Sequence, residues 1–357
     1  MDVAVDLKTS VLEKVYRGER LTQDDAVELF HSADLLELGM AANFVRKKFH
    51  PESEVTYIID RNINYSNVCY AECSFCAFYR APLEKDSYLH AFEVLDKKIA
   101  ETLALGGTGI LMQGGLHPEL KLEWYEGLLR HIKTKFPTIW VHGFSPPEIT
   151  NICKVSKLPL SIVMERLVAA GLDSLPGGGG EILVDRVRTI LAPRKCNTQE
   201  WLDVHEAAHK LNLRSSSTMM FGHIETLEER AEHLQRIRDL QDKTHGFMSF
   251  ICWTFQPENT LLRCETSTGA DFLRTLAISR IFLDNIENVQ SSWLTQGLKL
   301  GQVALQFGAN DMGSVMIEEN VVSAAGAHFV ASEEDLRRLI RDAGYTPLKR
   351  DTIYRLV

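Results

Sequence analysis

The chain has 357 residues, of which 45% are hydrophobic, and a formal net charge of −9. This length suits one large α/β barrel or two domains, and the negative charge argues against a nucleic-acid partner bound through its phosphates. The N-terminal residues alternate in charge without the apolar core of a secretory leader, and no stretch approaches the about 18 consecutive apolar residues of a membrane span. We therefore expect a cytoplasmic protein with no membrane or nucleic-acid partner.

The first part of the chain, residues 8–50, is predicted to be helical. Thr22 is followed by a pair of aspartates, which is typical of a helix N-cap with acidic residues in the first turn. Apolar residues then recur at helical spacing from Val27 to Leu38. We interpret residues 1–50 as an N-terminal helical extension.

From residue 55 onward, short apolar segments alternate with amphipathic ones. The predicted strands are residues 55–61, 108–113, 138–143, 171–175, 214–221, 247–255, 288–294 and 303–308. The predicted helices include residues 90–105, 121–135, 161–170, 199–211 and 227–241. Such alternation predicts an α/β fold with a parallel sheet, and eight units close into a (β/α)8 barrel of the TIM type. We assign the barrel to residues 51–320 and a C-terminal helical, capping segment to residues 321–357, with a helix at 332–343.

Glycines, prolines and polar residues gather directly after the predicted strands. These segments are the cysteine loop after Asn62, and residues 113–115, 145–148, 176–181, 222–223, 256–257 and 308–311. Barrel enzymes build their active sites at the carboxyl ends of the strands. The sequence therefore predicts a functional site at that rim.

Three cysteines, Cys69, Cys73 and Cys76, follow the first predicted strand with the spacing C-x3-C-x2-C and no fourth cysteine nearby. An ordinary [4Fe–4S] cluster takes four thiolates, one for each iron. Three thiolates leave one iron open to a small molecule. The spacing resembles that of the radical S-adenosylmethionine (SAM) superfamily, in which SAM chelates the open iron and is cleaved to a 5′-deoxyadenosyl radical.

Two alternatives to the cluster are a zinc site and a chance grouping of cysteines. A structural zinc site needs four ligands, usually as two pairs, and the remaining cysteines form no second pair. They are Cys153, Cys196, Cys252 and Cys264. Disulfides are not expected for an odd number of cysteines in a cytoplasmic chain. The cluster is the favoured interpretation, and a non-catalytic zinc-binding protein is the alternative from a different class.

Glycines mark two further loops. Gly114 and Gly115 allow close backbone approach to a ligand, although a simple tight turn explains them as well. The four glycines at 177–180 must form a loop, and no Lys-Ser/Thr follows them, so a phosphate-binding P-loop is not supported. Glu181 directly after them is either an acceptor for ribose hydroxyls or a solvated glutamate at a helix N-terminus.

Candidate proton carriers are His223 and Asp311. Histidine is easily poised near neutral pH, yet most of the 12 histidines must be structural or exposed. Asp173 lies within a predicted strand and is expected to make a structural hydrogen bond. Trp253 and Trp293 fall in strand patterns and are expected in the core.

Several segments together resemble the cyclic dehypoxanthinyl futalosine synthase family of radical SAM enzymes, which acts in the futalosine route to menaquinone. They include DRNINYSNVCYAECSFCAFYR, GILMQGGLHPEL, HGFSPPEI, AAGLDSLPGGGGEILVDRVR and FGANDMGSVMIEENVV. The resemblance runs from about residue 10 to the C-terminus, and Gly180 departs from it because the family pattern has alanine there. Aminofutalosine synthase and the deazaflavin FO synthase components share the loop and barrel and stay open as alternatives.

The resemblance implies an oxidative cyclase with a [4Fe–4S] cluster and SAM. The 5′-deoxyadenosyl radical would remove hydrogen from ribose C4′ of dehypoxanthinyl futalosine, and the carbon radical would add to the benzoate ring. The resemblance also implies an external electron donor such as flavodoxin or ferredoxin. The cofactor-binding residues would be Phe75 and Tyr79 at the adenine, Gln113, Gly114 and Gly115 at the methionine end, and Glu181 at the ribose. Ser145, His223, Asn310 and Asp311 would line the substrate cavity, with His223 or Asp311 receiving the proton lost on rearomatisation.

Overall fold

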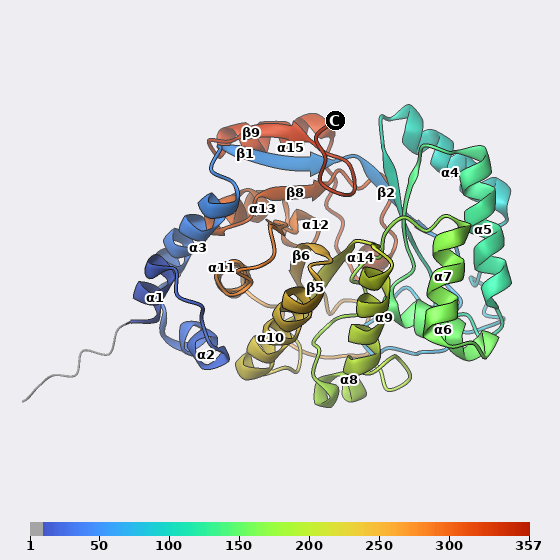
Figure 1. The fold of residues 1–357 in the computed structure, drawn as a ribbon, viewed down its shortest axis with the longest axis horizontal. Helices are drawn as coiled ribbons and strands as arrows, with labels where there is room; N and C mark the ends of the chain where they lie inside the picture. Colours follow the sequence, from blue (N-terminus) through green and yellow to red (C-terminus); the bar gives the residue numbers. More distant parts are fainter. Residues whose placement is uncertain (1–9) are drawn as a thin grey trace, which may run out of the picture.

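Parallel strands form a closed ring in the computed structural model, which describes residues 10–357 (Figure 1). The parts of the N-terminal expectations that fall on residues 1–9 lie outside the described residues. The strands are β1 (Glu54–Ile58), β2 (Asp60–Asn64), β3 (Gly109–Gln113), β4 (Trp140–Gly143), β5 (Ser215–Phe221), β6 (Phe247–Thr254), β7 (Asn288–Val289), β8 (Asp311–Ser314) and β9 (Thr346–Lys349).

The helices surround this ring. They are α1 (Val11–Arg17), α2 (Gln23–Ser32), α3 (Leu35–Phe49), α4 (Phe92–Ala104), α5 (Leu122–Lys135), α6 (Pro146–Ser156), α7 (Leu160–Ala170), α8 (Asp185–Leu191), α9 (Thr198–Lys210), α10 (Leu227–Thr244), α11 (Gly269–Phe282), α12 (Trp293–Gln296), α13 (Leu298–Ala304), the 3-10 helix η1 (Leu305–Phe307), α14 (Val321–Ala324) and α15 (Glu333–Asp342). In Figure 1, α4 to α7 lie at one end of the long axis and α1 to α3 at the other.

Three short sheets and single bridges close the barrel. The sheets are β2-β3-β4, β5-β6-β7 and β8-β1-β9, all with parallel pairing. Ser174 bridges to His142 of β4, Leu175 bridges to Ser215 of β5, and Gln290 bridges to the start of β8. β1 and β2 follow each other as one bent strand, so eight positions complete the ring. The predicted (β/α)8 arrangement is confirmed, although the fourth position is held by bridges instead of a full strand.

The predicted strand at 303–308 is wrong. Ala304, Leu305 and Phe307 are buried whereas Val303 is 42% exposed, which is the pattern of one helix face and not the alternation of a strand. The segment forms the end of α13 and then η1, and Gly308 ends it with a left-handed φ of 94°. The eighth barrel strand is β8, which starts eight residues beyond the predicted start at residue 303.

The N-terminal helices share the barrel's core. Thr22 caps α2 with a reciprocal pair of hydrogen bonds to Asp25, as its sequence suggested. Val45 of α3 and Ile281 of α11 belong to the same apolar cluster as the strands β1 and β5 to β7. The division at residue 50 therefore describes an extension packed on the barrel. Within residues 10–357, no helix is both long and apolar enough to cross a membrane.

The C-terminal segment is not purely helical. Helix α15 covers the predicted 332–343 region and buries Leu336 and Ile340. The chain then forms β9, which pairs in parallel with β1. This pairing carries Arg350, which directly follows β9, into the barrel interior, where its exposure is 3%. The capping segment thus supplies part of the cavity wall.

Candidate active site at the carboxyl ends of the barrel strands

A cavity of about 470 Å³ opens at the rim of the barrel. This volume lies within the range of small-molecule sites. All three motif cysteines line it, and the other four cysteines of the chain do not. The cavity continues downward past the inward-facing residues of β2, Asn64, Asn62 and Asp60.

The cysteine loop is held in place by its own backbone and by Arg80. Cys69 N–H donates to Arg80 O at 2.9 Å, and Arg80 N–H donates to Asn67 O at 2.8 Å. The Arg80 guanidinium also binds the carbonyl oxygens of residues 77–79. Ser74 donates twice to Leu191 O, which joins the loop to the end of α8. The thiols are therefore carried on a fixed loop, and Arg80 is a contributor that the sequence did not reveal.

The thiols fit a cluster better than a single metal ion. Among the described residues, no three His, Cys, Asp or Glu side chains lie close enough together to hold one ion, as a zinc site requires. In a cluster, each thiolate binds a different iron, so the sulfurs are spread more widely. Burial raises the pKa of Cys69, and raises that of Cys73 to about 12 despite nearby Lys195. These thiols must lose protons when they bind iron.

The glycines of the rim serve close packing between protein segments. A Cβ at Gly114 would lie 2.4 Å from the Tyr65 ring, and one at Gly115 would lie 2.2 Å from Val68 O in the cysteine loop. A Cβ at Gly178 would lie 2.4 Å from Gln113 Nε2. Side chains at these positions would push the rim loops apart. The glycines therefore let residues 113–115 pack against the cysteine loop and let Gly178 pack against Gln113.

Glu181 lies on the cavity wall in a buried ion pair. Its Oε1 accepts from Lys195 Nζ at 2.8 Å, and its Oε2 lies 3.6 Å from Arg188 Nη1. Burial opposes ionisation, but the two cations hold the pKa of Glu181 below its usual value. Glu181 is not at a helix N-terminus, because α8 begins only at residue 185. Lys195 Nζ also lies 5.1 Å from the centroid of the Phe75 ring.

Ser145 lines the cavity and starts α6 with a capping box. Its N–H and Oγ both bind Glu148 Oε2, at 2.8 and 2.6 Å. Glu148 Oε1 accepts from Gly114 N–H at 2.9 Å and from Tyr65 Oη at 2.7 Å. Glu148 therefore links the two rim loops, and the S-x-x-E pattern in the sequence could have identified it. The Ser145 hydroxyl hydrogen is engaged, so Ser145 can only accept from a ligand.

Asn310 and Asp311 do not line the cavity, which corrects the expectation for both. Asn310 directly precedes β8, and Asp311 is the first residue of that strand. Both therefore lie at the amino end of the eighth strand. Asp311 is fully buried, and its two oxygens accept from Arg350, Thr56 and Gly313 N–H. Asn310 Oδ1 accepts from Arg280 and from the backbone of β7. Both residues have a structural role, because their hydrogen bonds join neighbouring segments of the barrel.

His223 also does not line the cavity. The turn at Gly222, with φ 85°, folds the ring back so that its side chain has no exposure. Nδ1 lies 2.8 Å from Glu225 Oε2, and Nε2 lies 3.0 Å from Met220 O. Burial opposes the charge on Glu225, yet His223 and Arg230 lower its pKa to about 2. The expectation that His223 faces the substrate is not met by this geometry.

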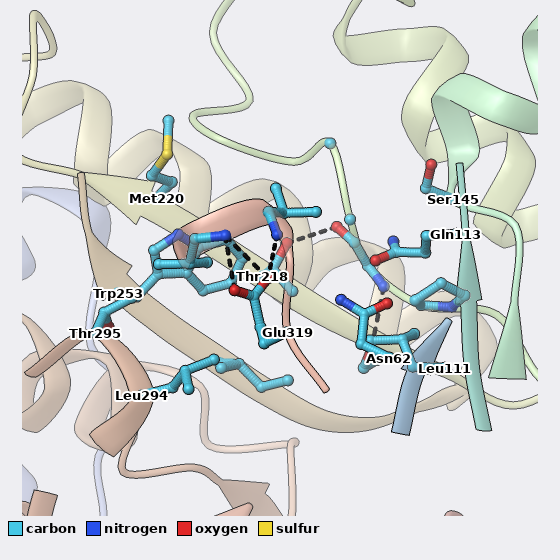
Figure 2. A pocket seen from close by; sticks show the side chains of 18 of the residues that line it. Asn62, Leu111, Gln113, Ser145, Thr218, Met220, Trp253, Leu294, Thr295 and Glu319 are labelled. Carbon is cyan, nitrogen blue, oxygen red and sulfur yellow. Dashed lines mark hydrogen bonds between the residues drawn. The ribbon is translucent and has the colours of Figure 1, made fainter. Parts of the chain in front are cut away.

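The cavity has two unlike walls, as Figure 2 shows. Asn62, Gln113 and Ser145 lie on one side, and Trp253 and Leu294 on the other. Trp253 is half-buried and faces the cavity, so its assignment to the core was wrong, whereas Trp293, which also borders the cavity, is 2% exposed as expected of a core residue. Phe75, Phe78 and Tyr79 complete the rim next to the thiols.

Asp173 binds Lys133 and Val141 N–H, which confirms a structural role. The sequence analysis did not single out Asp60, His142, Lys195 or Arg350 on these walls. Asp60 and His142 begin two of the quoted family segments, whereas Lys195 and Arg350 lie outside them.

The sequence matches the radical SAM superfamily over residues 63–237 and the CofH/MqnC C-terminal region over residues 244–357. It is similar to solved structures of methylornithine synthase (PylB), with a TM-score of 0.71 and 18% identity over 95% of this chain and 97% of that one. The FeFe-hydrogenase maturase HydG from Carboxydothermus hydrogenoformans gives the same TM-score with 17% identity, over 97% and 80% of the two chains. These likenesses confirm the fold.

Curated relatives are much more similar. A "Cyclic dehypoxanthine futalosine synthase" from Halalkalibacterium halodurans is 48% identical over 97% of this chain and 94% of its own length. A protein of the same name from Streptomyces coelicolor is 44% identical over 96% and 87%. An "Aminodeoxyfutalosine synthase" from Thermus thermophilus is 38% identical over 97% and 95%.

Fold, thiol loop and sequence similarity together define a radical SAM enzyme. The chain belongs to this superfamily, in the group of full-length relatives that contains the cyclic dehypoxanthine futalosine synthases. Its cofactors are those of the superfamily, a [4Fe–4S] cluster and SAM. The cavity fits them, because three free thiols line it and would hold a cluster with one iron left for SAM.

Proposed function

We propose that this protein is a radical SAM cyclase that converts dehypoxanthine futalosine into its cyclic form in menaquinone biosynthesis. The observation that carries the proposal is similarity along nearly the whole chain to two proteins of that name, at 48% and 44% identity. Relatives named for other reactions are similar over comparable lengths but at 38% to 40% identity among the most similar of them. The cyclase is therefore the reaction that the similarity favours.

We assign the cofactors to the rim. Cys69, Cys73 and Cys76 would hold the cluster, residues 113–115 would meet the methionine end of SAM, and Glu181 would accept from its ribose. Phe75 and Tyr79 would flank the adenine. When bound, these cofactors supply the radical that takes hydrogen from the substrate and a one-electron acceptor for the later oxidation. The chain's own part is to bind, orient and exclude water.

The two walls of the cavity support a substrate with a sugar at one end and an aromatic ring at the other. Asn62 and Ser145 offer amide and hydroxyl groups suited to ribose hydroxyls. Trp253 and Leu294 offer an apolar surface for a benzoate ring. This division would hold the ring and the ribose carbon against each other, as ring closure between them requires.

An external one-electron donor such as flavodoxin or ferredoxin belongs to the proposal, because within residues 10–357 the chain offers only the thiol loop as a redox site. The seven cysteines are all free, which agrees with a reducing cytoplasm. Reduction of the reconstituted enzyme by each donor, followed through 5′-deoxyadenosine formation, tests this part.

The reaction itself is tested by one anaerobic incubation that offers the substrates of all three candidate enzymes. The cyclase should give a product two hydrogens lighter than dehypoxanthine futalosine and one 5′-deoxyadenosine per turnover. Deuterium placed at ribose C4′ should appear in that deoxyadenosine. An adenosylated product, or turnover of tyrosine with the diaminouracil, would contradict the cyclase and favour the other reactions.

A further inference from the structure

One carboxylate in the cavity has an oxygen that is free for a ligand. Asp60 begins β2 and lines the deep end of the cavity, about 13 Å along the strand from Asn64. Its Oδ1 accepts from Ser314 Oγ of β8. Within residues 10–357, no donor binds its Oδ2. Asp60 is half-buried although it lies inside the barrel, because the cavity reaches it.

The other carboxylates of the cavity are already engaged. Glu148 accepts four hydrogen bonds, from Tyr65, Gly114 N–H and both donors of Ser145. Glu181 is paired with Lys195. Glu319 binds the backbone N–H groups of residues 321–323 with both oxygens. Glu148 and Glu319 would have to give up existing bonds to accept a proton from a substrate, and Glu181, whose second oxygen lies 3.6 Å from Arg188, is assigned to the ribose of SAM at the rim.

The one histidine of the cavity is a poor proton acceptor. His142 is held between Ser174 Oγ, 2.7 Å from Nδ1, and Ser216 Oγ, 3.5 Å from Nε2. Burial, with a further contribution from Arg350, lowers its pKa to about 3. It therefore stays neutral and binds a proton only weakly. Arg350 and Lys195 are cations and cannot accept one.

We propose that Asp60 Oδ2 receives the proton that the aromatic ring loses after ring closure. The inference rests on the proposed function. The new carbon–carbon bond leaves one ring carbon with a hydrogen and the ring with an unpaired electron. The C–H bond then breaks, its proton goes to Asp60, and the electron goes to a one-electron acceptor, the oxidised iron–sulfur cluster. The ring is aromatic again, and Asp60 is left as a neutral carboxylic acid that later loses its proton to water.

The surroundings of Asp60 favour this role. The charged groups that face it are Arg350 from the C-terminal segment and Asp311 from β8, which neutralise each other as a pair. Burial is the largest influence and raises the pKa of Asp60, while Ser314 and Arg350 lower it and Asp311 adds to the rise. A carboxylate with a raised pKa is a stronger base than an ordinary aspartate.

The test compares Asp60→Asn with wild type in anaerobic incubations with C4′-deuterated substrate. Product formation should fall by about 10²- to 10⁴-fold, the usual contribution of a general base. Deuterated 5′-deoxyadenosine should still form, in excess over product. If product and deoxyadenosine fall together, or if neither falls, Asp60 does not accept the proton. Failure of the cyclase proposal would look different, because wild type itself would then give no deuterated deoxyadenosine.

Two further measurements separate the role from a loss of structure. Asp203→Asn, on the exposed face of α9, removes a carboxylate without touching the cavity and should leave both products unchanged. Ser314→Ala removes the donor to Asp60 Oδ1 and should move the acidic limb of product formation to higher pH, whereas an unmoved limb would overturn the proposal. Carbon NMR of labelled aspartate in the full chain without cofactors should show one carboxyl titrating above the others, and Asp60→Asn should remove that signal.

Discussion

Two buried ion pairs each place at least one member on the wall of the cavity, and they serve different ends. Glu181 with Lys195 stands at the rim, and its side chains are 10% and 13% exposed. Asp311 with Arg350 stands at the floor, and its side chains are 0% and 3% exposed. The rim pair has one oxygen held only at 3.6 Å, by Arg188, whereas both oxygens of Asp311 are saturated. The rim pair can exchange partners with a ligand, and the floor pair cannot.

The comparison shows that a buried charged residue indicates a binding role only when its hydrogen-bond partners are known as well. From the sequence, Glu181 and Asp311 were equal candidates after predicted strands. The structure separates them by the number of bonds that each oxygen already makes. A saturated pair ties β1, β8 and the C-terminal segment together, and an unsaturated one can bind a ribose.

The largest effect is expected at the thiol loop. Cys73→Ala removes one of three thiolates, so the cluster should not assemble and turnover should vanish. Iron content and the electron-resonance signal after reconstitution measure this. Cys153→Ala, on α6 outside the cavity, is the control and should keep full iron content. A Cys73→Ala protein with about four irons and normal turnover would show that the rim is misassigned.

The second-largest effect is expected for the Asp311–Arg350 pair at the floor of the cavity. Arg350→Met leaves the fully buried Asp311 carboxylate without its cation, which should lower the free energy of unfolding by about 3–5 kcal/mol. Arg355→Met breaks a pair in the same segment whose arginine side chain is 66% exposed, and should cost about 0–1 kcal/mol. Denaturant unfolding measures both. Equal costs for the two variants would contradict a structural floor pair.

A smaller effect is expected at the rim pair. Glu181→Gln removes charge-assisted hydrogen bonds to the ribose of SAM, so SAM affinity should weaken by about ten- to a hundredfold. The cluster should remain, as its iron content would show. Glu72→Gln, in the exposed part of the cysteine loop, is the control and should bind SAM as wild type does. Unchanged affinity in Glu181→Gln would remove that residue from the SAM site.

The smallest effect is a difference in pH dependence between the two regions. The lowered pKa of Glu181 keeps its carboxylate ionised as pH falls below 4.5, so SAM binding should stay flat there. Because burial raises the pKa of Asp60 above 3.8, acidification removes its ionised, proton-accepting form at a higher pH than in an ordinary aspartate. Product formation should therefore fall on acidification before SAM binding does. Parallel pH profiles of the two would show that no carboxylate with a raised pKa limits product formation.

Local patterns predicted much of the fold. Strand–helix alternation located β3, β5 and β6 to within one or two residues, and it located α4, α5 and α9 equally well. The segments that it missed depend on contacts far along the chain. Residues 174–175 hold a barrel position through single bridges, and β9 exists because β1 offers a free edge. An apolar segment such as 303–308 does not show by itself whether it forms a helix or a strand, because that depends on which of its side chains the neighbouring segments bury.

The sequence by itself determined the chemistry of this protein. Three cysteines on one loop predict an open cluster, because their spacing and the absence of a fourth cysteine nearby can be read from the chain alone. The tertiary structure decided which polar groups remain free to act. No spacing or residue type singled out Asp60, Lys195 or Arg350, and His223 and Asp311 were removed from the cavity by one turn and one strand shift. Hydrogen-bond saturation depends on partners far along the chain, 255 residues apart for Thr56 and Asp311, and no local pattern encodes it.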